Sequence, residues 1–285
     1  MQHDPGGNEE CTIPPMAEIS IITICKNDPE GLTRTWKSVT GCILPDMDWI
    51  VIDADSGEET QQVLNGIRAE GWTAISEPDD GIYDGMRKGL ERTEGQWVLY
   101  MNAGDEFADP DVLQDVQPLL RKAPVRSIVF GDAIECPPDG MTRLRMAPGF
   151  DQIESGMPAS HQSIFFNRDA LVEFPFQMGS SSADWIQLLA MHLGGVKTIR
   201  FRRAVCRFDT TGISRTNWRN SIRERTEHLR KSGRWTPALA RKYRHITLHA
   251  MIANGLAAII PRSMWIRIAR ASKVFRRSIR HTDAG

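Results

Sequence analysis

The sequence has little that would carry the chain out of the cell. Its five cysteines form no Cys-x-x-Cys pair and no short spacing with histidine. An odd number in this arrangement argues against a disulfide framework or a zinc site, so we expect reduced thiols in the cytoplasm. The first ten residues are polar and acidic. They lack the basic and apolar segments of a signal peptide.

Two other features are missing. The uncharged stretch over residues 246–260 is 15 residues long and stops at Pro261, whereas a helix needs about 20 apolar residues to cross a bilayer. The phosphate-binding glycine loops GxxxxGKS/T and GxGxxG do not occur. Their absence argues against kinases, P-loop enzymes and nicotinamide-binding enzymes.

The charge is divided unevenly along the chain. The formal net charge is −1. Residues 1–214 hold 18 Lys and Arg against 33 Asp and Glu, whereas residues 215–285 hold 17 against 3. A neutral average made of two opposed parts indicates a basic tail with an anionic partner.

Short strands and helices alternate in the first hundred residues. The predicted strands cover 19–24, 49–52, 72–76 and 96–101, and the predicted helices cover 32–39, 58–70 and 82–92. This alternation is typical of βαβ units with parallel strands. Farther along we expect a helix over 111–120, a strand over 127–132, a turn-rich hairpin over 137–148, a strand over 161–167, a helix over 180–194, a strand over 197–208 and helices from 217 onward. The fold class is α/β, with a mostly parallel sheet flanked by helices.

Acidic and amide side chains follow each of the first four strands. They are Asn27 and Asp28, Asp53 and Asp55, Asp79, Asp80 and Asp84, and Asn102 and Asp105. Because ligands of α/β proteins gather at the carboxyl ends of the strands, we expect these side chains to share one rim. Acids crowded together repel each other, so they favour a cation or a donor-rich ligand. Mg²⁺ or Mn²⁺ on a phosphate fits such a set. The alternative is that Asp and Asn serve as helix caps and turn formers.

Four segments resemble the family 2 glycosyltransferases of the GT-A fold, in their bacterial polysaccharide branch. Residues 19–23 are similar to the opening strand of that family, 52–57 to its nucleoside turn, and 95–105 to the strand that leads to its metal-binding DxD motif. The most specific match is 76–86, SEPDDGIYDGM. The resemblance covers roughly residues 18–210. It implies a GT-A domain over 17–214, whereas composition and charge predict a disordered lead over 1–16 and a basic amphipathic helical extension over 215–285.

The resemblance implies a role for each rim residue. Thr23 and Asp53 would contact the nucleoside of a sugar nucleotide, with UDP favoured, and Asn27, Asp79 and Asp84 would line the same pocket. Arg87 stands where the family usually has Asn, and is either a phosphate contact or a solvated side chain.

The metal motif departs from the family pattern, because DxD is replaced by residues 102–105, NAGD. The resemblance implies that Asp105 binds the divalent cation, Mg²⁺ or Mn²⁺. The cation would offset charge on the leaving nucleoside diphosphate. Asn102 would support the turn. His161 is a second candidate ligand, the alternative being a core or hydrogen-bonding histidine.

An inverting transfer needs a base for the proton of the acceptor hydroxyl. The family places an acid at the start of a late helix, and Asp184 in residues 180–185, SSSADW, matches that position. The alternative is an acid favoured there by the helix dipole. The QxxRW signature of processive synthases is missing, which favours a single transfer.

The basic tail matches the pattern of a helix lying on a membrane. Met264, Trp265, Ile268 and Val274 alternate with arginines and lysines, as in amphipathic helices on anionic bilayers. We therefore expect a cytoplasmic protein on the inner face of the cell membrane, where the resemblance places an acceptor carried on polyprenyl diphosphate. The alternative is a helical cap on the domain. No motif supports nucleic acid as the partner.

The predicted function is a single, inverting sugar transfer in exopolysaccharide or O-antigen assembly. One rival is a sugar-phosphate nucleotidyltransferase, which normally has a Gly-rich basic loop where this chain has residues 26–28, KND. The other is a degenerate nucleotide-sugar binder, suggested by the reduced DxD.

Overall fold

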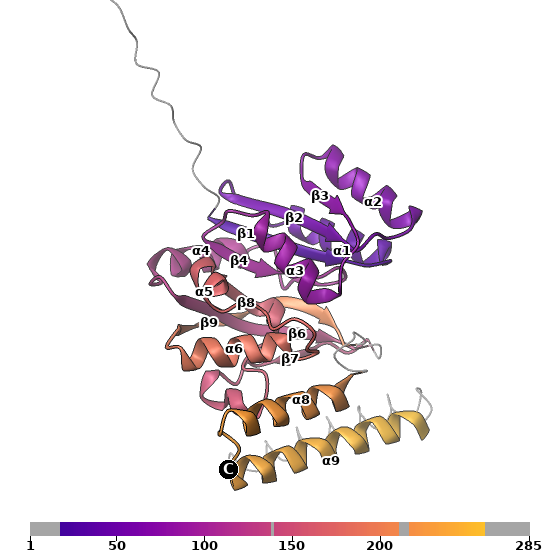
Figure 1. Ribbon diagram of the computed structural model, residues 1–285. Coiled ribbons are helices and arrows are strands. Elements are labelled where there is room, and N and C mark those ends of the chain that lie inside the picture. Colours follow the sequence, from indigo (N-terminus) through magenta and orange to yellow (C-terminus); the bar gives the residue numbers. More distant parts are fainter. Residues whose placement is uncertain (1–17, 138–139, 211–216, 260–285) are drawn as a thin grey trace, which may run out of the picture.

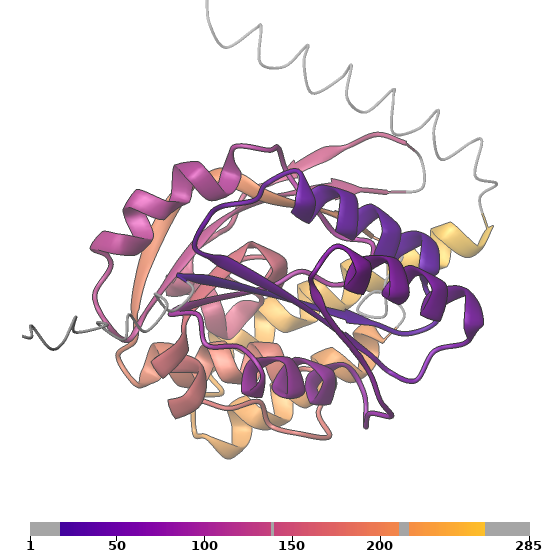
Figure 2. The ribbon, with the colours of Figure 1, turned by 90° about the horizontal axis from the view of Figure 1, so that it is seen from above.

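One twisted sheet runs through the molecule, and helices cover both of its faces (Figure 1, Figure 2). The computed structural model describes residues 18–137, 140–210 and 217–259. The strands are β1 (Ile19–Cys25), β2 (Met47–Asp53), β3 (Thr73–Ser76), β4 (Trp97–Tyr100), β5 (Glu106–Phe107), β6 (Ser127–Cys136), β7 (Arg143–Arg145), β8 (Ile164–Asn167) and β9 (Lys197–Asp209). The helices are α1 (Pro29–Thr40), α2 (Glu58–Ala69), α3 (Ile82–Glu91), α4 (Val112–Lys122), α5 (Arg168–Glu173), α6 (Ala183–Leu193), α8 (Trp218–Lys231) and α9 (Pro237–Ile259), with 3-10 turns η1 (Phe150–Ser155) and η2 (His161–Ser163).

The strand order within the described residues is β3-β2-β1-β4-β8-β6-β9-β5, with β7 paired to β6. The first four of these strands are parallel. β8 is antiparallel to both β4 and β6, so β6 and its parallel neighbour β9 share the direction of β4. The predicted mostly parallel α/β sheet is therefore confirmed.

The strand expected over residues 161–167 is partly wrong, because its first three residues form η2. The amide and the hydroxyl of Ser163 both donate to the carbonyl oxygen of Ser160, at 2.9 and 2.8 Å. These two bonds turn the chain before β8 begins, which hydrophobic patterning cannot show.

Local sequence explains the elements around the rim. β1 is apolar and largely β-branched, which suits a buried strand. α1 begins at Pro29, and Asp28 caps it by accepting a hydrogen bond from the amide of Gly31 at 2.8 Å. α3 lies close to β1 because a Cβ at Gly89 would stand only 2.3 Å from the Ile22 side chain.

Apolar side chains form a layer on each face of the sheet. One layer includes Trp49 and Leu99, and the other includes Tyr100, Phe166 and Trp185. Leu229 of α8 and Tyr243 of α9 belong to the second layer, so the described part of the basic extension packs against the sheet domain. In the residues that the structure describes, no helix is both long and apolar enough to span a bilayer. The predicted lead over 1–16 and the amphipathic stretch over 262–277 lie outside those residues.

Candidate active site at the carboxyl edge of the sheet

The loops after β1 and β2 are joined by Asn27. Its backbone has a φ of 49°, a left-handed conformation that Asn adopts more readily than most residues. Its amide N–H donates to the hydroxyl of Ser56 at 2.7 Å, and its side-chain oxygen accepts from the amide of Gly57 at 3.1 Å. Cys25, Asp53 and Ser76 are aligned across β1, β2 and β3, so the three strands end together.

Asp53 is fully buried beneath this edge. Its carboxylate accepts hydrogen bonds from four donors. Ser56 supplies its backbone amide (2.9 Å) and its hydroxyl (2.5 Å), Ser76 its hydroxyl (2.7 Å) and Gln61 its side-chain amide (3.2 Å). Thr23 is also fully buried, and its hydroxyl accepts from the Trp49 indole at 2.9 Å. Both side chains have protein partners, and their contacts with a nucleoside stay predictions.

Asp84 is neutralised by cations of its own helix. Its carboxylate lies 2.7 Å from the Arg87 guanidinium and 3.2 Å from the Lys88 ammonium. The Arg87 hydrogen bond is the main reason that the pKa of Asp84 is lowered to about 2, and the amide of Asp80 and Lys88 add to it. Arg87 also pairs with Glu91 at 2.5 Å. A phosphate contact by Arg87 stays a prediction, since the structure shows it held by two acids.

Asp79 lies in the loop between β3 and α3. Its side chain accepts a hydrogen bond from the amide of Gly81 at 3.0 Å. A Cβ at Gly85 would stand 3.1 Å from Ile24 and 3.2 Å from the Asp79 carboxylate. The glycine therefore allows this loop and α3 to approach the end of β1, which brings Asp79 to the same edge as Asn27.

The turn over residues 102–105 follows β4, and Gly104 gives it a φ of 93°. The hydroxyl of Thr35 braces it by accepting from the amide of Gly104 (3.0 Å) and donating to the carbonyl of Asp105 (2.7 Å). Asp105 is buried, with 7% of the residue exposed, and its carboxylate accepts from the backbone amide of Asn102 at 3.2 Å. Burial raises the pKa of Asp105 to about 7, although hydrogen bonds from Gln162 and Asn102 oppose the shift.

His161 does not face this carboxylate. Its ring stacks on Tyr100 with 5.2 Å between centroids, and Phe166 and Phe176 lie beside it. Burial lowers its pKa, and its buried Nε2 has no hydrogen-bond partner among the described residues. Gln162, rather than His161, contacts Asp105. The histidine therefore has the core position that the sequence left open as the alternative.

The sequence predicts a cation at the rim because several acids crowd together there, and the structure does not bear out that reason. Among the residues that the structure describes, no three His, Cys, Asp or Glu side chains gather closely enough to hold a metal ion. The rim acids do share an edge, but Asp53 and Asp84 are satisfied by donors of the chain itself. Their proximity alone is therefore no argument for a cation. The buried side-chain oxygen of Asn102 is the exception at this rim, because it has no hydrogen-bond partner in the part of the chain that the structure describes.

Asp184 lies in the first turn of α6, as predicted. Its carboxylate accepts from the amide of Trp185 at 2.7 Å. The hydroxyl of Tyr83 lies 3.5 Å from the carbonyl oxygen of Ser181 and close enough to Asp184 for the charge of that carboxylate to act on it. Burial, followed by the charge of Asp184, raises the pKa of Tyr83. This contact joins α3, which carries Asp84, to the helix of the candidate base.

The sequence analysis missed Tyr83 and Gln162. Tyr83 stands inside the most specific matching string, directly before Asp84, and Gln162 directly follows His161. Each lies next to a residue that was singled out. Their partners, Asp184 and Asp105, lie far away in the sequence, so no local pattern identifies them.

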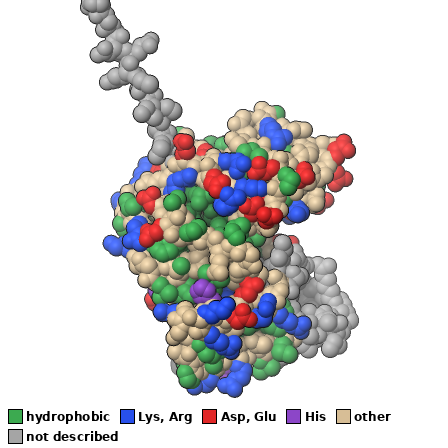
Figure 3. Space-filling model, viewed as in Figure 1, with side chains coloured by type: hydrophobic (Ala, Val, Ile, Leu, Met, Phe, Trp, Pro, Cys, Tyr) green, Lys and Arg blue, Asp and Glu red, His purple; other side chains and the backbone are tan. Residues whose placement is uncertain are grey.

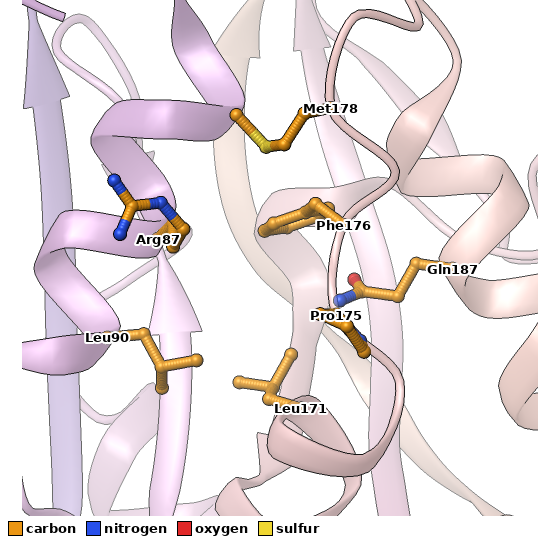
Figure 4. Close-up of a pocket in the computed structure, with 7 residues that line it drawn as sticks. All are labelled: Arg87, Leu90, Leu171, Pro175, Phe176, Met178 and Gln187. Carbon is orange, nitrogen blue, oxygen red and sulfur yellow. The ribbon is translucent and has the colours of Figure 1, made fainter.

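A shallow pocket lies between α3 and the segment that follows α5 (Figure 4). Its lining is largely apolar and includes Leu90, Leu171 and Phe176, with Arg87 and Gln187 as the polar members. The Arg87 guanidinium points away from Phe176 (Figure 4) toward its acidic partners. None of the candidate acids lines this pocket, and its link to the rim is Arg87, which pairs with Asp84.

Comparisons with known proteins agree with this architecture. A family model described as glycosyl transferase family 2 matches residues 20–174. An uncharacterized glycosyltransferase of Mycobacterium tuberculosis is 32% identical over 212 residues, which cover 68% of this chain and 76% of the relative. A PGL/p-HBAD biosynthesis glycosyltransferase of Mycobacterium bovis is 26% identical over 159 residues, 54% of this chain and 60% of the relative.

Two solved structures share the fold. The mannosyltransferase PcManGT of Pyrobaculum calidifontis, in complex with GDP-Man and Mn²⁺, has a TM-score of 0.60 at 16% identity and covers 91% of this chain and 80% of that one. Residues 1–349 of Staphylococcus aureus TarS, in complex with UDP-GlcNAc, have a TM-score of 0.60 at 14% identity and cover 86% and 77%. With a family model over more than half of its length and a relative of this identity and coverage, the chain belongs to glycosyltransferase family 2 and has the GT-A fold.

Proposed function

We propose that this glycosyltransferase moves one sugar from a nucleotide sugar, with UDP-sugars favoured, to a glycan acceptor carried on a polyprenyl diphosphate, in exopolysaccharide or O-antigen assembly. The observation that carries the proposal is the position of Asp184, which lies in the first turn of α6 beside Tyr83 of α3, so that its charge raises the pKa of that tyrosine. The Asp184 carboxylate, which has few protein donors, therefore lies beside α3, the helix that carries Asp84. The neighbours solved with UDP-GlcNAc and GDP-Man support a nucleotide-sugar donor.

Asp184 is the proposed base. The backbone amide of Trp185 holds its side chain by a hydrogen bond of 2.7 Å. A carboxylate fixed in this way takes the proton from the acceptor hydroxyl as that oxygen attacks the anomeric carbon. The nucleoside diphosphate leaves from the opposite face, so the configuration at the anomeric carbon is inverted.

A divalent cation, Mg²⁺ or Mn²⁺, fits the turn after β4. The carboxylate of Asp105 and the unpartnered side-chain oxygen of Asn102 are hard oxygen donors, which both cations prefer. These two residues would hold it, without His161. The bound ion acts as a Lewis acid that offsets charge on the departing diphosphate. The Mn²⁺ complex of the mannosyltransferase supports this assignment.

The basic extension supports a place on the inner face of the membrane. Residues 217–251 carry nine Lys and Arg but only two Glu, and basic side chains lie over α8 and α9 (Figure 3). Each basic residue close to an anionic bilayer contributes about 1 kcal/mol. Flotation of the full chain with anionic and with neutral liposomes tests this part. Equal binding to both would contradict the charge argument.

The donor assignment is tested with a panel of sugar nucleotides. The full-length protein is incubated with each donor in Mn²⁺, Mg²⁺ or chelator, and released nucleoside diphosphate is measured. We expect one UDP-sugar to be hydrolysed above the rest, with stimulation by one of the metals. If nucleotides bind and none is turned over, with or without membrane extract as acceptor source, the degenerate nucleotide-sugar binder replaces the enzyme.

A further inference from the structure

The first helix of the basic extension is joined to the segment that leads into Asp184. Glu224 of α8 accepts hydrogen bonds from the hydroxyls of Ser180 and Ser181 at 2.8 and 2.9 Å. The hydroxyls of Ser182 and Ser221 share a further bond of 2.9 Å. All three serines of the Ser-rich segment are therefore anchored on α8, and the helix becomes part of the frame around Asp184.

Arg225, the next residue of α8, has no acidic partner among the residues that the structure describes. Its guanidinium stacks over the ring of Trp185, with 5.6 Å from Cζ to the centroid. Its Nε is buried and makes no hydrogen bond. Of the two neighbouring acids on α8, Glu224 is held by serines and Glu227 faces Arg223 at 4.0 Å. No ion pair of Arg225 is found across the described parts of the chain.

The surroundings of Arg225 are those of the candidate base. Trp185 directly follows Asp184 in α6. The guanidinium is close enough to the hydroxyl of Tyr83 to oppose the rise of its pKa caused by burial, and it has the same effect on Tyr243. Because the charge of Asp184 also acts on Tyr83, the Arg225 guanidinium and the candidate base lie around one tyrosine.

The buried Nε–H of Arg225 is unfavourable without an acceptor, because this donor has lost water without gaining a hydrogen bond in the described part of the protein. The arrangement is stable once an oxyanion supplies that acceptor. The guanidinium presents its donors as a planar fork that matches two phosphate oxygens, and stacking on Trp185 fixes the plane of that fork.

We propose that Arg225 binds a phosphate group of the acceptor, beside the hydroxyl that Asp184 deprotonates. This inference rests on the proposed function and adds an anion subsite that α8 contributes. The acceptor is the fitting source of the phosphate because Arg225 packs on α6, whereas the donor rim is formed by the loops after β1 to β4. The cations Arg87 and Lys88 beside that rim are already paired with acids.

The test measures binding of two probes by isothermal titration calorimetry. Geranyl phosphate represents a phosphate-bearing acceptor, and UDP represents the donor. The variants are Arg225→Ala and Arg225→Lys. Arg223→Ala is the matched control, since it removes the same charge from a more exposed position of the same helix. Thermal unfolding of each variant reports whether the fold is kept. Should Arg225→Ala unfold, Arg225→Gln retains most of the stem over Trp185.

We expect Arg225→Ala to weaken geranyl phosphate binding at least tenfold and Arg225→Lys to weaken it less, because the ammonium keeps the charge and loses the fork. Arg223→Ala should stay within twofold of wild type, and UDP binding should stay within twofold in every variant. Equal effects of the Arg225 and Arg223 changes would overturn the proposal. A parallel loss of UDP binding would also overturn it, since the phosphate would then belong to the donor. Failure of the proposed function itself would show separately, as wild-type protein that binds no nucleotide.

Discussion

The rim after β1 to β4 and the junction of α3, α6 and α8 differ in how their charged groups are satisfied. At the rim, four protein donors surround Asp53, and Arg87 and Lys88 neutralise Asp84. At the junction, Arg225 has no acid partner within the described chain. A charged side chain that is paired within the protein helps to fix the shape of a site. A charged side chain without such a partner is available to bind a ligand. We therefore propose that the rim is a preorganised site for the donor, and that the junction binds and deprotonates the acceptor.

The largest expected effect is on the rate of sugar transfer and comes from a change at the junction. Asp184→Asn should lower sugar transfer by about a thousandfold, within the range expected for removal of a general base. The amide oxygen of Asn can still accept from the Trp185 N–H, so α6 should keep its start. Steady-state release of nucleoside diphosphate measures the effect, with nucleotide affinity as the control. An unchanged rate would remove Asp184 from the role of base.

Metal binding should depend on the rim alone. Asp105→Ala should weaken Mn²⁺ binding by about 10- to 100-fold, because it removes the only carboxylate of the turn over 102–105. Paramagnetic resonance of free Mn²⁺ during a titration measures this. Asp111→Asn is the control, since Asp111 is an exposed acid near the same loop. Equal Mn²⁺ affinity of the two variants would place the cation elsewhere.

Tyr83→Phe tests the contact between the two regions. The hydroxyl lies within the electrostatic reach of Asp184, so its loss changes the polar surroundings of the candidate base, and we expect transfer to fall about tenfold with donor affinity unchanged. Tyr243→Phe is the matched control, because it removes a hydroxyl bonded to the carbonyl of Glu154 at 3.1 Å. If the two changes reduce transfer equally, the Tyr83 hydroxyl has no special relation to Asp184.

The smallest expected effect concerns stability at the rim. The pKa of Asp84 is lowered to about 2, mainly by Arg87, so its ionised form stabilises the folded state above its unfolded pKa of about 4. This contribution is lost as the pH falls from about 4 to 2. Asp84→Asn should therefore cost about 1 kcal/mol at pH 7, with the partly exposed Arg87 limiting the amount.

The cost of Asp84→Asn should shrink as the pH approaches 3. Urea unfolding of the wild type and the variant at pH 7 and pH 3 gives the comparison. A difference in unfolding free energy that is the same at both pH values would show that the ion pair with Arg87 is not its cause.

The sequence predicts the rim better than the junction for a physical reason. Asn27, Asp53 and Asp105 each follow a short apolar strand, and parallel pairing of those strands is enough to bring the loops to one edge. The sequence does not show that protein hydrogen-bond donors already surround the Asp53 carboxylate. These donors, Ser56, Gln61 and Ser76, come from a turn, a helix and another strand.

The junction depends on packing between distant parts of the chain. Tyr83 and Asp184 are about a hundred positions apart, and Arg225 lies in a segment that composition alone separates from the domain. His161 illustrates the same limit, because its neighbour Gln162 reaches Asp105 while His161 stacks on Tyr100. One residue along a 3-10 turn decides which of the two faces the acid.

The independence of the two regions is tested most directly with the double variant Asp184→Asn/Arg225→Ala. Calorimetric titration with the nucleoside diphosphate of the selected donor, in the presence of Mn²⁺, is compared with wild type. The account predicts a dissociation constant within twofold of wild type, together with loss of sugar transfer. A tenfold or greater loss of nucleotide affinity would contradict it, because the junction would then belong to the donor site.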